Sequence, residues 1–191
     1  MTQRAFGTGV VIAILLVFGA VVLSGLEKAN VNSALPLSET AIIREQAAAK
    51  HLDPALIAAV IYAESKFEPR PSSAGAQGLM QILPATALYL AHLSGGSRFT
   101  TSDLASPRIN VAYGSYYLRY LLDHYHGDEM LAVAAYNGGL ANVDHWVAHA
   151  IDAGGHLKAA EIPFPETREY VQRVLTAQRA YRATYPRELG L

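Results

Sequence analysis

The sequence predicts an all-α domain over residues 37–191, built from roughly six or seven helices. Two patterns support this fold class. Apolar residues return every three or four positions in successive segments, which is the spacing that places them on one face of a helix. Aspartate and proline, which favour helix starts, stand just before several of these segments. No segment alternates apolar and polar residues for long, so a β-sheet is not expected.

The first two helices are predicted at 37–51 and 53–65. Ser38 is a good N-cap for the first helix, because its hydroxyl can accept a hydrogen bond from a free backbone N–H. Asp53 is a strong N-cap for the second helix. Pro54 occupies the first helical position there, where its missing N–H costs nothing.

The remaining helices follow an irregular segment, 68–84, that is rich in proline, serine and glycine. Pro84 opens the next helix in the same way as Pro54. Asp128 begins a later helix, and the two glycines Gly138 and Gly139 mark its end. The last helix is expected to be the longest. These helices are predicted at 84–93, 109–125, 128–137, 141–151 and 165–185.

The sequence predicts a membrane-spanning segment near the start of the chain. No charged residue lies in the segment 5–26, which at about 1.5 Å per residue spans roughly 30 Å, the thickness of a bilayer core. Residues 1–4 carry one arginine and form an expected cytoplasmic stub. We expect an uncleaved signal anchor at 5–26 and a polar linker at 27–36. A cleaved signal peptide is the alternative, although the apolar run is longer than usual for one.

Charge and cysteine content exclude several function classes. The net charge is −1, so no strong positive field indicates nucleic acid binding. The chain has no cysteine, which excludes disulfides, thiolate chemistry and a lipid-modified N-terminal cysteine. The residues after the anchor suffice for one domain with one core.

An acid interrupts the apolar pattern of the second helix. Leu56, Ile57, Val60 and Ile61 form the stripe of an amphipathic helix, and the next position on that stripe is Glu64. A carboxyl group among apolar neighbours is desolvated, which raises its pKa and suits it to general acid catalysis. A glutamate that turns to solvent or pairs with a nearby cation is the simpler alternative.

Polar side chains in other segments favour the catalytic interpretation. The segment 68–84 ends in apolar residues, so we expect it to return to the core beside Glu64. It carries Gln81 and two glycines expected at close backbone approaches, Gly75 and Gly78. Amides and phenols of this kind need hydrogen-bonding partners, which a sugar supplies. Tyrosine rings also suit sugar binding, although most of the eleven tyrosines are expected to pack helices.

A second catalytic carboxylate is hard to find. Glycoside cleavage normally uses two acids that flank the bond. Glu68 and Asp103 lie in polar contexts, and Glu166, at the start of the last helix, comes closest. One acid is sufficient if the substrate itself supplies the nucleophile. The carboxyl then protonates the leaving oxygen, and the resulting carboxylate removes a proton from the attacking group.

Seven histidines raise the question of a metal site. His145 and His149 are four residues apart on one helix, and His124 and His126 lie beyond the end of another. Neither pair has a third ligand at a recognisable spacing. We therefore expect no metal and no cofactor.

Five motifs, in one order, resemble the catalytic domain of soluble lytic transglycosylases, which is related in fold to goose-type lysozyme. The resemblance covers about residues 37–181. The motifs are ESKFEP, GAQGLMQILPATA, INVAYGSYYL, LAVAAYNGG and IPFPETREYV. The resemblance implies a lysozyme-like helical fold and a peptidoglycan substrate. It also implies cleavage of the β-1,4 bond between N-acetylmuramic acid and N-acetylglucosamine without water, which leaves a 1,6-anhydro end.

The resemblance also implies roles for single residues. Glu64 matches the catalytic acid and base, and Ser65, its neighbour in the motif, is expected to bind the glycan. Six further residues match positions that bind the glycan: Ser72, Gln81, Tyr117, Tyr136, Asn137 and Glu166. The chain departs from the common pattern in a loop before Ser72 that is one residue shorter, and in Leu83, where methionine is frequent.

The resemblance implies partners and a location as well. The expected partners are peptidoglycan strands, the inner membrane through the anchor, and secretion or cell-wall machinery. The domain is then periplasmic, either anchored or, if the signal is cleaved, soluble. Two other functions stay open at this stage: a goose-type lysozyme that hydrolyses with water, and a catalytically silent glycan-binding scaffold.

Overall fold

The computed structural model describes residues 35–70, 72–96 and 98–191. The predicted stub at 1–4, the anchor at 5–26 and most of the linker at 27–36 lie outside these residues. None of the described helices combines the length and the apolar character needed to cross a bilayer. Residues 37–191 form one compact unit.

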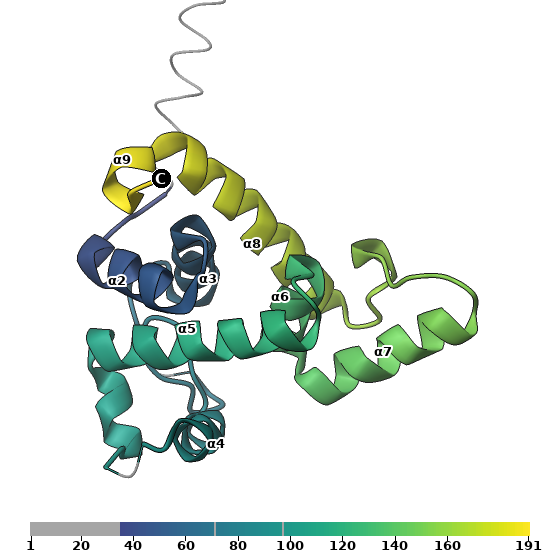
Figure 1. Cartoon of the computed structure of the whole chain (residues 1–191), viewed down its shortest axis with the longest axis horizontal. Coiled ribbons are helices and arrows are strands. Elements are labelled where there is room, and N and C mark those ends of the chain that lie inside the picture. The colour runs from purple at the N-terminus through teal and green to yellow at the C-terminus, as the bar shows by residue number, and fades with distance from the viewer. Residues whose placement is uncertain (1–34, 71, 97) are drawn as a thin grey trace, which may run out of the picture. The chain divides into compact units, whose positions relative to one another are not determined.

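The domain is all-α, as predicted (Figure 1). In the described part of the chain, extended pairing is limited to a single bridge between Gln77 and Ile82. The helices are α2 (Thr40–Lys50), α3 (Pro54–Ser65), α4 (Pro84–Ser94), α5 (Pro107–His124), α6 (Glu129–Gly138), α7 (Leu140–Asp152), α8 (Pro165–Thr184) and α9 (Pro186–Leu189), with short 3₁₀ helices η1 (Thr101–Ala105) and η2 (Ala159–Glu161).

Helix α3 is the centre of the core. It packs against α2 and, most extensively, against α8. Every residue from Ala55 to Ile61 is buried, so the prediction of an amphipathic stripe was too narrow. The alanines at 55, 58 and 59 explain the difference, because small side chains let neighbouring helices approach on the sides that the stripe left open. Burying each leucine or isoleucine here contributes about 1.5–3 kcal/mol.

The start signals of α3 act as predicted. The Asp53 carboxylate accepts a hydrogen bond from the backbone N–H of Ala55 at 2.9 Å. The same carboxylate binds α8, because Arg182 Nη2 lies 2.8 Å and Gln178 Nε2 lies 2.7 Å from Asp53 Oδ2. One aspartate therefore both caps α3 and attaches the last long helix to it.

The two ends of the domain differ in detail from the sequence prediction. Helix α2 begins at Thr40 rather than after Ser38. Glu39 holds the cap position with φ 55° and makes no side-chain cap. At the other end of the domain, the predicted last helix at 165–185 corresponds to α8, and a further short helix that was not predicted follows it. The chain turns at Tyr185, and Pro186 starts the short helix α9, because proline cannot extend the hydrogen-bonding pattern of α8.

Helices α5, α6 and α8 hold the cleft described below. Helix α6 packs on both α5 and α8. Helix α7 then runs away from α6, and the chain returns through η2 to the start of α8 (Figure 1). The ends of α3 and α6, the start of α8 and the middle of α5 contribute residues to one region.

Candidate active site

The segment between α3 and α4 returns to the core, as the sequence predicts. It leaves α3 through Lys66 and Phe67, which both have positive φ. Leu79 and Met80 are then buried. Gln77 and Ile82 exchange two backbone hydrogen bonds of 3.0 Å, which close a tight turn around the buried pair.

Asn110 of α5 fixes this turn. Its side chain is fully buried, and its Oδ1 accepts from the backbone N–H of Met80 at 2.8 Å. Its Nδ2 donates to Gln77 O at 2.8 Å and to Leu104 O at 3.1 Å. Asn110 was not predicted from the sequence. The available signal was a polar residue next to Val111 on a helix whose neighbouring positions are apolar.

Glycine is required at positions 75 and 78 for two different structural reasons. A Cβ on Gly78 would lie 2.0 Å from Asn110 Nδ2, so the predicted close approach is confirmed there. A Cβ on Gly75 would meet nothing within 4 Å. The prediction of a close approach at Gly75 was therefore wrong, and its φ of 80° is the reason for glycine at that position.

The turn, α5, α6 and the start of α8 enclose a cleft of about 410 Å³. Seven of the eight predicted site residues line it. They come from five separate segments, so the fold brings together what the sequence keeps apart. The lining residues predicted from sequence are Glu64, Ser72, Gln81, Tyr117, Tyr136, Asn137 and Glu166.

Glu64 lies in the last turn of α3, partly exposed to the cleft. Burial raises its pKa from 4.5 to about 7. The nearby charge of Glu166 acts in the same direction. A hydrogen bond from Tyr170 and the charge of Arg173 oppose the rise without cancelling it. The raised pKa keeps part of the Glu64 carboxyl protonated at neutral pH, as a general acid requires.

Two phenols lie near enough to this carboxyl to interact with its charge. Tyr170 Oη donates to Glu64 Oε1 at 2.7 Å, and Tyr136 Oη donates to Met80 O at 3.0 Å. Burial raises the pKa of both tyrosines well above 10, so both remain hydrogen-bond donors. Tyr170 was not predicted from the sequence, although it lies four residues after Glu166, one turn further along the same helix.

Ser65 is the predicted residue that does not line the cleft. Its Oγ donates to Leu79 O at 2.8 Å and lies 3.2 Å from Ile61 O. It therefore connects the end of α3 to the returning turn. Its hydroxyl supports the residues beside Glu64 and does not face the cavity.

Ser72 and Gln81 line the cleft but also hold the loop in shape. Ser72 Oγ accepts from the backbone N–H of Ala76 at 2.9 Å. Gln81 has φ 45°, and its Nε2 donates to Arg70 O at 3.0 Å and to Gly78 O at 2.8 Å. The amide nitrogen of Gln81 is thus used within the loop.

The opposite wall of the cleft is aromatic and amide-rich. The rings of Tyr117 and Tyr136 are 5.3 Å apart. Asn137 Oδ1 accepts from Thr167 Oγ1 at 2.8 Å, which joins the end of α6 to the start of α8. Glu166 is exposed, in the first turn of α8. This wall offers ring faces together with polar groups, the combination that sugar binding uses.

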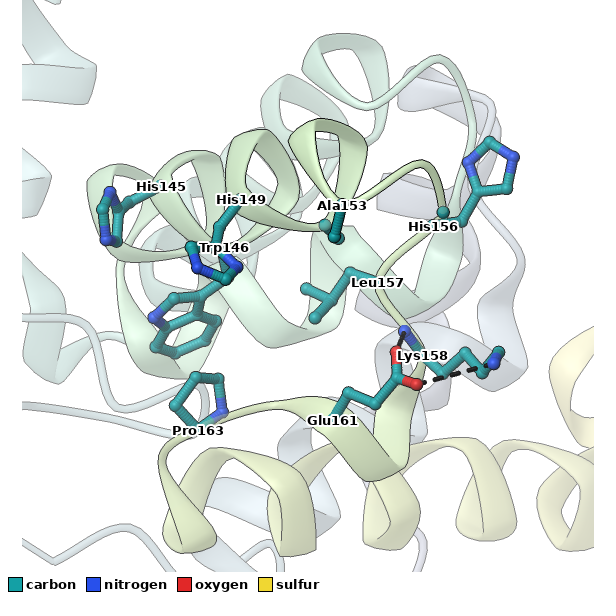
Figure 2. A pocket seen from close by; sticks show the side chains of 11 residues that line it. His145, Trp146, His149, Ala153, His156, Leu157, Lys158, Glu161 and Pro163 are labelled. Carbon is teal, nitrogen blue, oxygen red and sulfur yellow. Dashed lines mark hydrogen bonds and ion pairs between the residues drawn. The ribbon is translucent and has the colours of Figure 1, made fainter.

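The histidine pairs do not form a metal site in the described residues, which contain no group of three or more metal-binding side chains. His124 Nε2 lies 2.9 Å from Asp144 Oδ1. His145 and His149 instead line a second cavity, beside Trp146 (Figure 2).

Residues 41–157 match the protein family described as the transglycosylase SLT domain. The match covers more than half of the chain, so the chain belongs to this family. The predicted membership is confirmed.

Individual proteins that are similar to this chain are also lytic transglycosylases. The soluble lytic murein transglycosylase of Escherichia coli K12 is 30% identical over 158 residues, which are 80% of this chain and 24% of that protein. A lytic transglycosylase of Pseudomonas aeruginosa, solved as an inactive mutant, is 32% identical with a TM-score of 0.70, over 78% of this chain and 24% of that one. The 70-kDa soluble lytic transglycosylase of E. coli is 29% identical with a TM-score of 0.72, over 78% of this chain and 25% of that one.

These neighbours confirm the predicted lysozyme-like helical fold for the described domain. The chain spans about a quarter of the length of these relatives. A membrane-bound lytic murein transglycosylase C from Cronobacter sakazakii is also similar, at 29% identity over 74% of this chain and 45% of that protein.

Proposed function

We propose that this protein is a murein lytic transglycosylase that cleaves the β-1,4 bond between N-acetylmuramic acid and N-acetylglucosamine without water. The observation that carries the proposal is the state of Glu64. It is a carboxyl with a pKa of about 7, in a cleft with sugar-binding side chains, in a chain of the transglycosylase SLT family.

Glu64 acts first as an acid. Its proton passes to the bridging oxygen as the bond from that oxygen to C1 of the muramyl sugar breaks. The substrate's own acetamido group assists at C1. The Glu64 carboxylate then removes the proton of the muramyl C6 hydroxyl, whose oxygen forms the new bond to C1. The products are an anhydro end and a free sugar hydroxyl, and Glu64 regains its proton.

Tyr170 supports the second half of this cycle. Its hydroxyl donates to Glu64, and a hydrogen bond to a carboxylate stabilises the charged form. Burial favours the protonated form. The two effects together allow one carboxyl to give up a proton and take one back.

The other lining residues hold the glycan. Tyr117 and Tyr136 present ring faces, and Asn137 and Glu166 present polar groups to sugar hydroxyls and amides. We assign Ser65 a positioning role instead, because its hydroxyl is bonded to Leu79 O and lies outside the cleft lining.

The experiment is digestion of purified murein by the wild-type protein and by Glu64→Gln, with products identified by mass spectrometry. Glutamine preserves shape but cannot donate an acidic proton. We expect the wild type to release muramyl products that are one water lighter than the products of hydrolysis. We expect the variant to release no muramyl products. Circular dichroism should show both proteins folded. Equal cleavage by Glu64→Gln would refute the assignment.

A water-using hydrolase is the second candidate, because Glu166 lines the same cleft and could activate a water. Reducing muramyl ends in place of anhydro ends would establish that reaction. The third candidate, a silent glycan-binding scaffold, requires that the wild type bind murein and release no fragments.

We also propose that the domain acts outside the inner membrane, held there by residues 5–26. Membrane fractionation tests this location. The full chain should sediment with membranes, and a chain starting at residue 27 should remain in the supernatant with its activity. A full chain recovered only in the soluble fraction would contradict the anchor.

A further inference from the structure

A second cavity, of about 670 Å³, lies between α7 and η2 (Figure 2). We call it the α7 pocket. Its apolar side is formed by Trp146, Leu157 and Pro163. Trp146 extends from α7 toward Pro163, and Leu157 points into the space between α7 and η2 (Figure 2). The pocket can therefore bury small apolar groups.

Hydrogen-bond donors surround this apolar side. His145 and His149 line the pocket from α7, and Lys158 lines it from the segment before η2. Among the described lining residues the one carboxylate is Glu161. It already accepts from the backbone N–H of Lys158 at 3.0 Å and pairs with Lys158 Nζ at 3.5 Å. The remaining imidazole and ammonium N–H groups favour a ligand with free carboxylates.

The α7 pocket and the cleft are neighbours along the chain. Pro163 lines the pocket and Glu166 lines the cleft. These residues are three Cα steps apart, so their Cα atoms are separated by at most about 11 Å.

The end of α6 makes a second connection. Asn137 lines the cleft, and a Cβ on the next residue, Gly138, would lie 3.4 Å from the Trp146 ring. Phe164, which is 46% exposed, packs edge-on to Trp146 with the ring centres 4.9 Å apart. The wall between the two cavities is therefore thin.

We propose that the α7 pocket binds the short acidic peptide that murein carries on its muramyl sugars. This assignment rests on the proposed function of the cleft. Such peptides present alanine methyl groups and free carboxylates, which match the apolar side and the donors of the pocket. A peptide of three extended residues spans about 10 Å, which is the separation that Pro163 and Glu166 allow.

Trp146 makes binding measurable without turnover, because it is the single tryptophan of the chain and lines the pocket. The full-length protein is titrated with the peptides that an amidase releases from murein. We expect a saturable change in tryptophan fluorescence for the wild type and for Glu64→Gln. The dissociation constant should rise about tenfold in His149→Glu, because a hydrogen-bond donor is replaced by a carboxylate that repels the acidic peptide.

The matched control is His92→Glu. His92 is also an exposed histidine on a helix, but it lines neither cavity. The peptide should bind to this variant as it does to the wild type. Both positions are exposed, so both variants should keep the wild-type circular dichroism spectrum.

Kinetics give the second measurement. Murein strands with peptides and strands stripped by the amidase are compared as substrates. His149→Glu should lower kcat/KM about tenfold on peptide-bearing strands and leave stripped strands unchanged. Identical fluorescence titrations for His149→Glu and His92→Glu, or no response in the wild type, would overturn the proposal. Absence of cleavage of both substrates by the wild type would refute the proposed function and leave the binding result standing.

Discussion

The hydroxyl of Tyr170 donates a hydrogen bond of 2.7 Å to the carboxylate of Glu64 across a sequence separation of 106 residues. Burial raises the pKa of Glu64, and this hydrogen bond is the largest of the effects that lower it. The value of about 7 is a balance between the two. Removing either effect should therefore move the pH range in which the protein acts.

Replacing Tyr170 with phenylalanine should move the pH profile upward. Wild-type kcat/KM should fall as pH rises through about 7, because the acid loses its proton there. Without the phenol, the charged form of Glu64 is less stable, so this fall should occur roughly 0.5–1 pH unit higher. The maximal kcat should decrease about tenfold, since the carboxylate intermediate also loses its donor.

Tyr116→Phe is the control for this measurement, because Tyr116 lies on α5 and does not line the cleft. Its pH profile should equal that of the wild type. If Tyr170→Phe gave the same profile as Tyr116→Phe, the hydrogen bond to Glu64 would have no role in the reaction.

The same pKa predicts how stability changes with pH. Between pH 4.5 and about 7 the unfolded chain loses the Glu64 proton and the folded protein keeps it. The free energy of unfolding therefore decreases with rising pH in this window, by at most about 3 kcal/mol in total. Glu64→Gln has no titrating group at this position, so its free energy of unfolding does not show this decrease. It should match the wild type in stability near pH 4 and exceed it at pH 8.

Urea unfolding at both pH values measures this difference. Taking the variant minus the wild type cancels the titration of all other groups. A difference that stays constant from pH 4 to pH 8 would show that Glu64 has an ordinary pKa in the folded protein.

Asn110→Ala should destabilise the domain and disable the cleft together. The substitution leaves Met80 N–H and the carbonyls of Gln77 and Leu104 without their buried partner. The expected loss is about 3 kcal/mol, measured by urea unfolding. Asn142→Ala is the comparison, because Asn142 also binds one carbonyl, that of Gly138, but is exposed. It should cost less than about 1 kcal/mol.

Gly114→Ala tests the contact between α5 and the returning turn. A Cβ at this position would lie 2.4 Å from Met80 Sδ, so Met80 must shift. We expect a loss of about 1–3 kcal/mol and reduced murein cleavage, since the turn also carries Gln81. Gly155→Ala should leave stability within about 0.5 kcal/mol, because a Cβ there meets no atom closer than 3.8 Å. Equal melting temperatures for the two variants would contradict the packing described here.

Local signals in the sequence were enough to predict the fold class and to single out Glu64, which lines the cleft. Asp53, Pro54, Pro84 and Asp128 each mark a helix start by their own chemistry, so neighbouring residues suffice to locate it. Glu64 stands out because one polar residue interrupts an apolar run. In both cases the relevant information lies within a few residues.

Features that depend on distant partners could not be predicted in this way. Tyr170 and Asn110 act on groups 106 and 30 residues away, and nothing near them in the sequence indicates those contacts. Ser65 was assigned to the glycan by its place in a motif, but its direction depends on where Leu79 returns. The full burial of α3 likewise depends on α2 and α8 together.

The packing of α3 against α8 also has a consequence for when activity can begin. Glu64 is synthesised early, whereas the helix that covers α3 and supplies Tyr170 is the last long helix of the chain. A ribosome-bound or truncated chain that ends before residue 165 therefore contains the acid without its cover or its phenol. Such fragments should leave the cell wall intact, so the order of the helices itself delays cleavage until α8 has been synthesised.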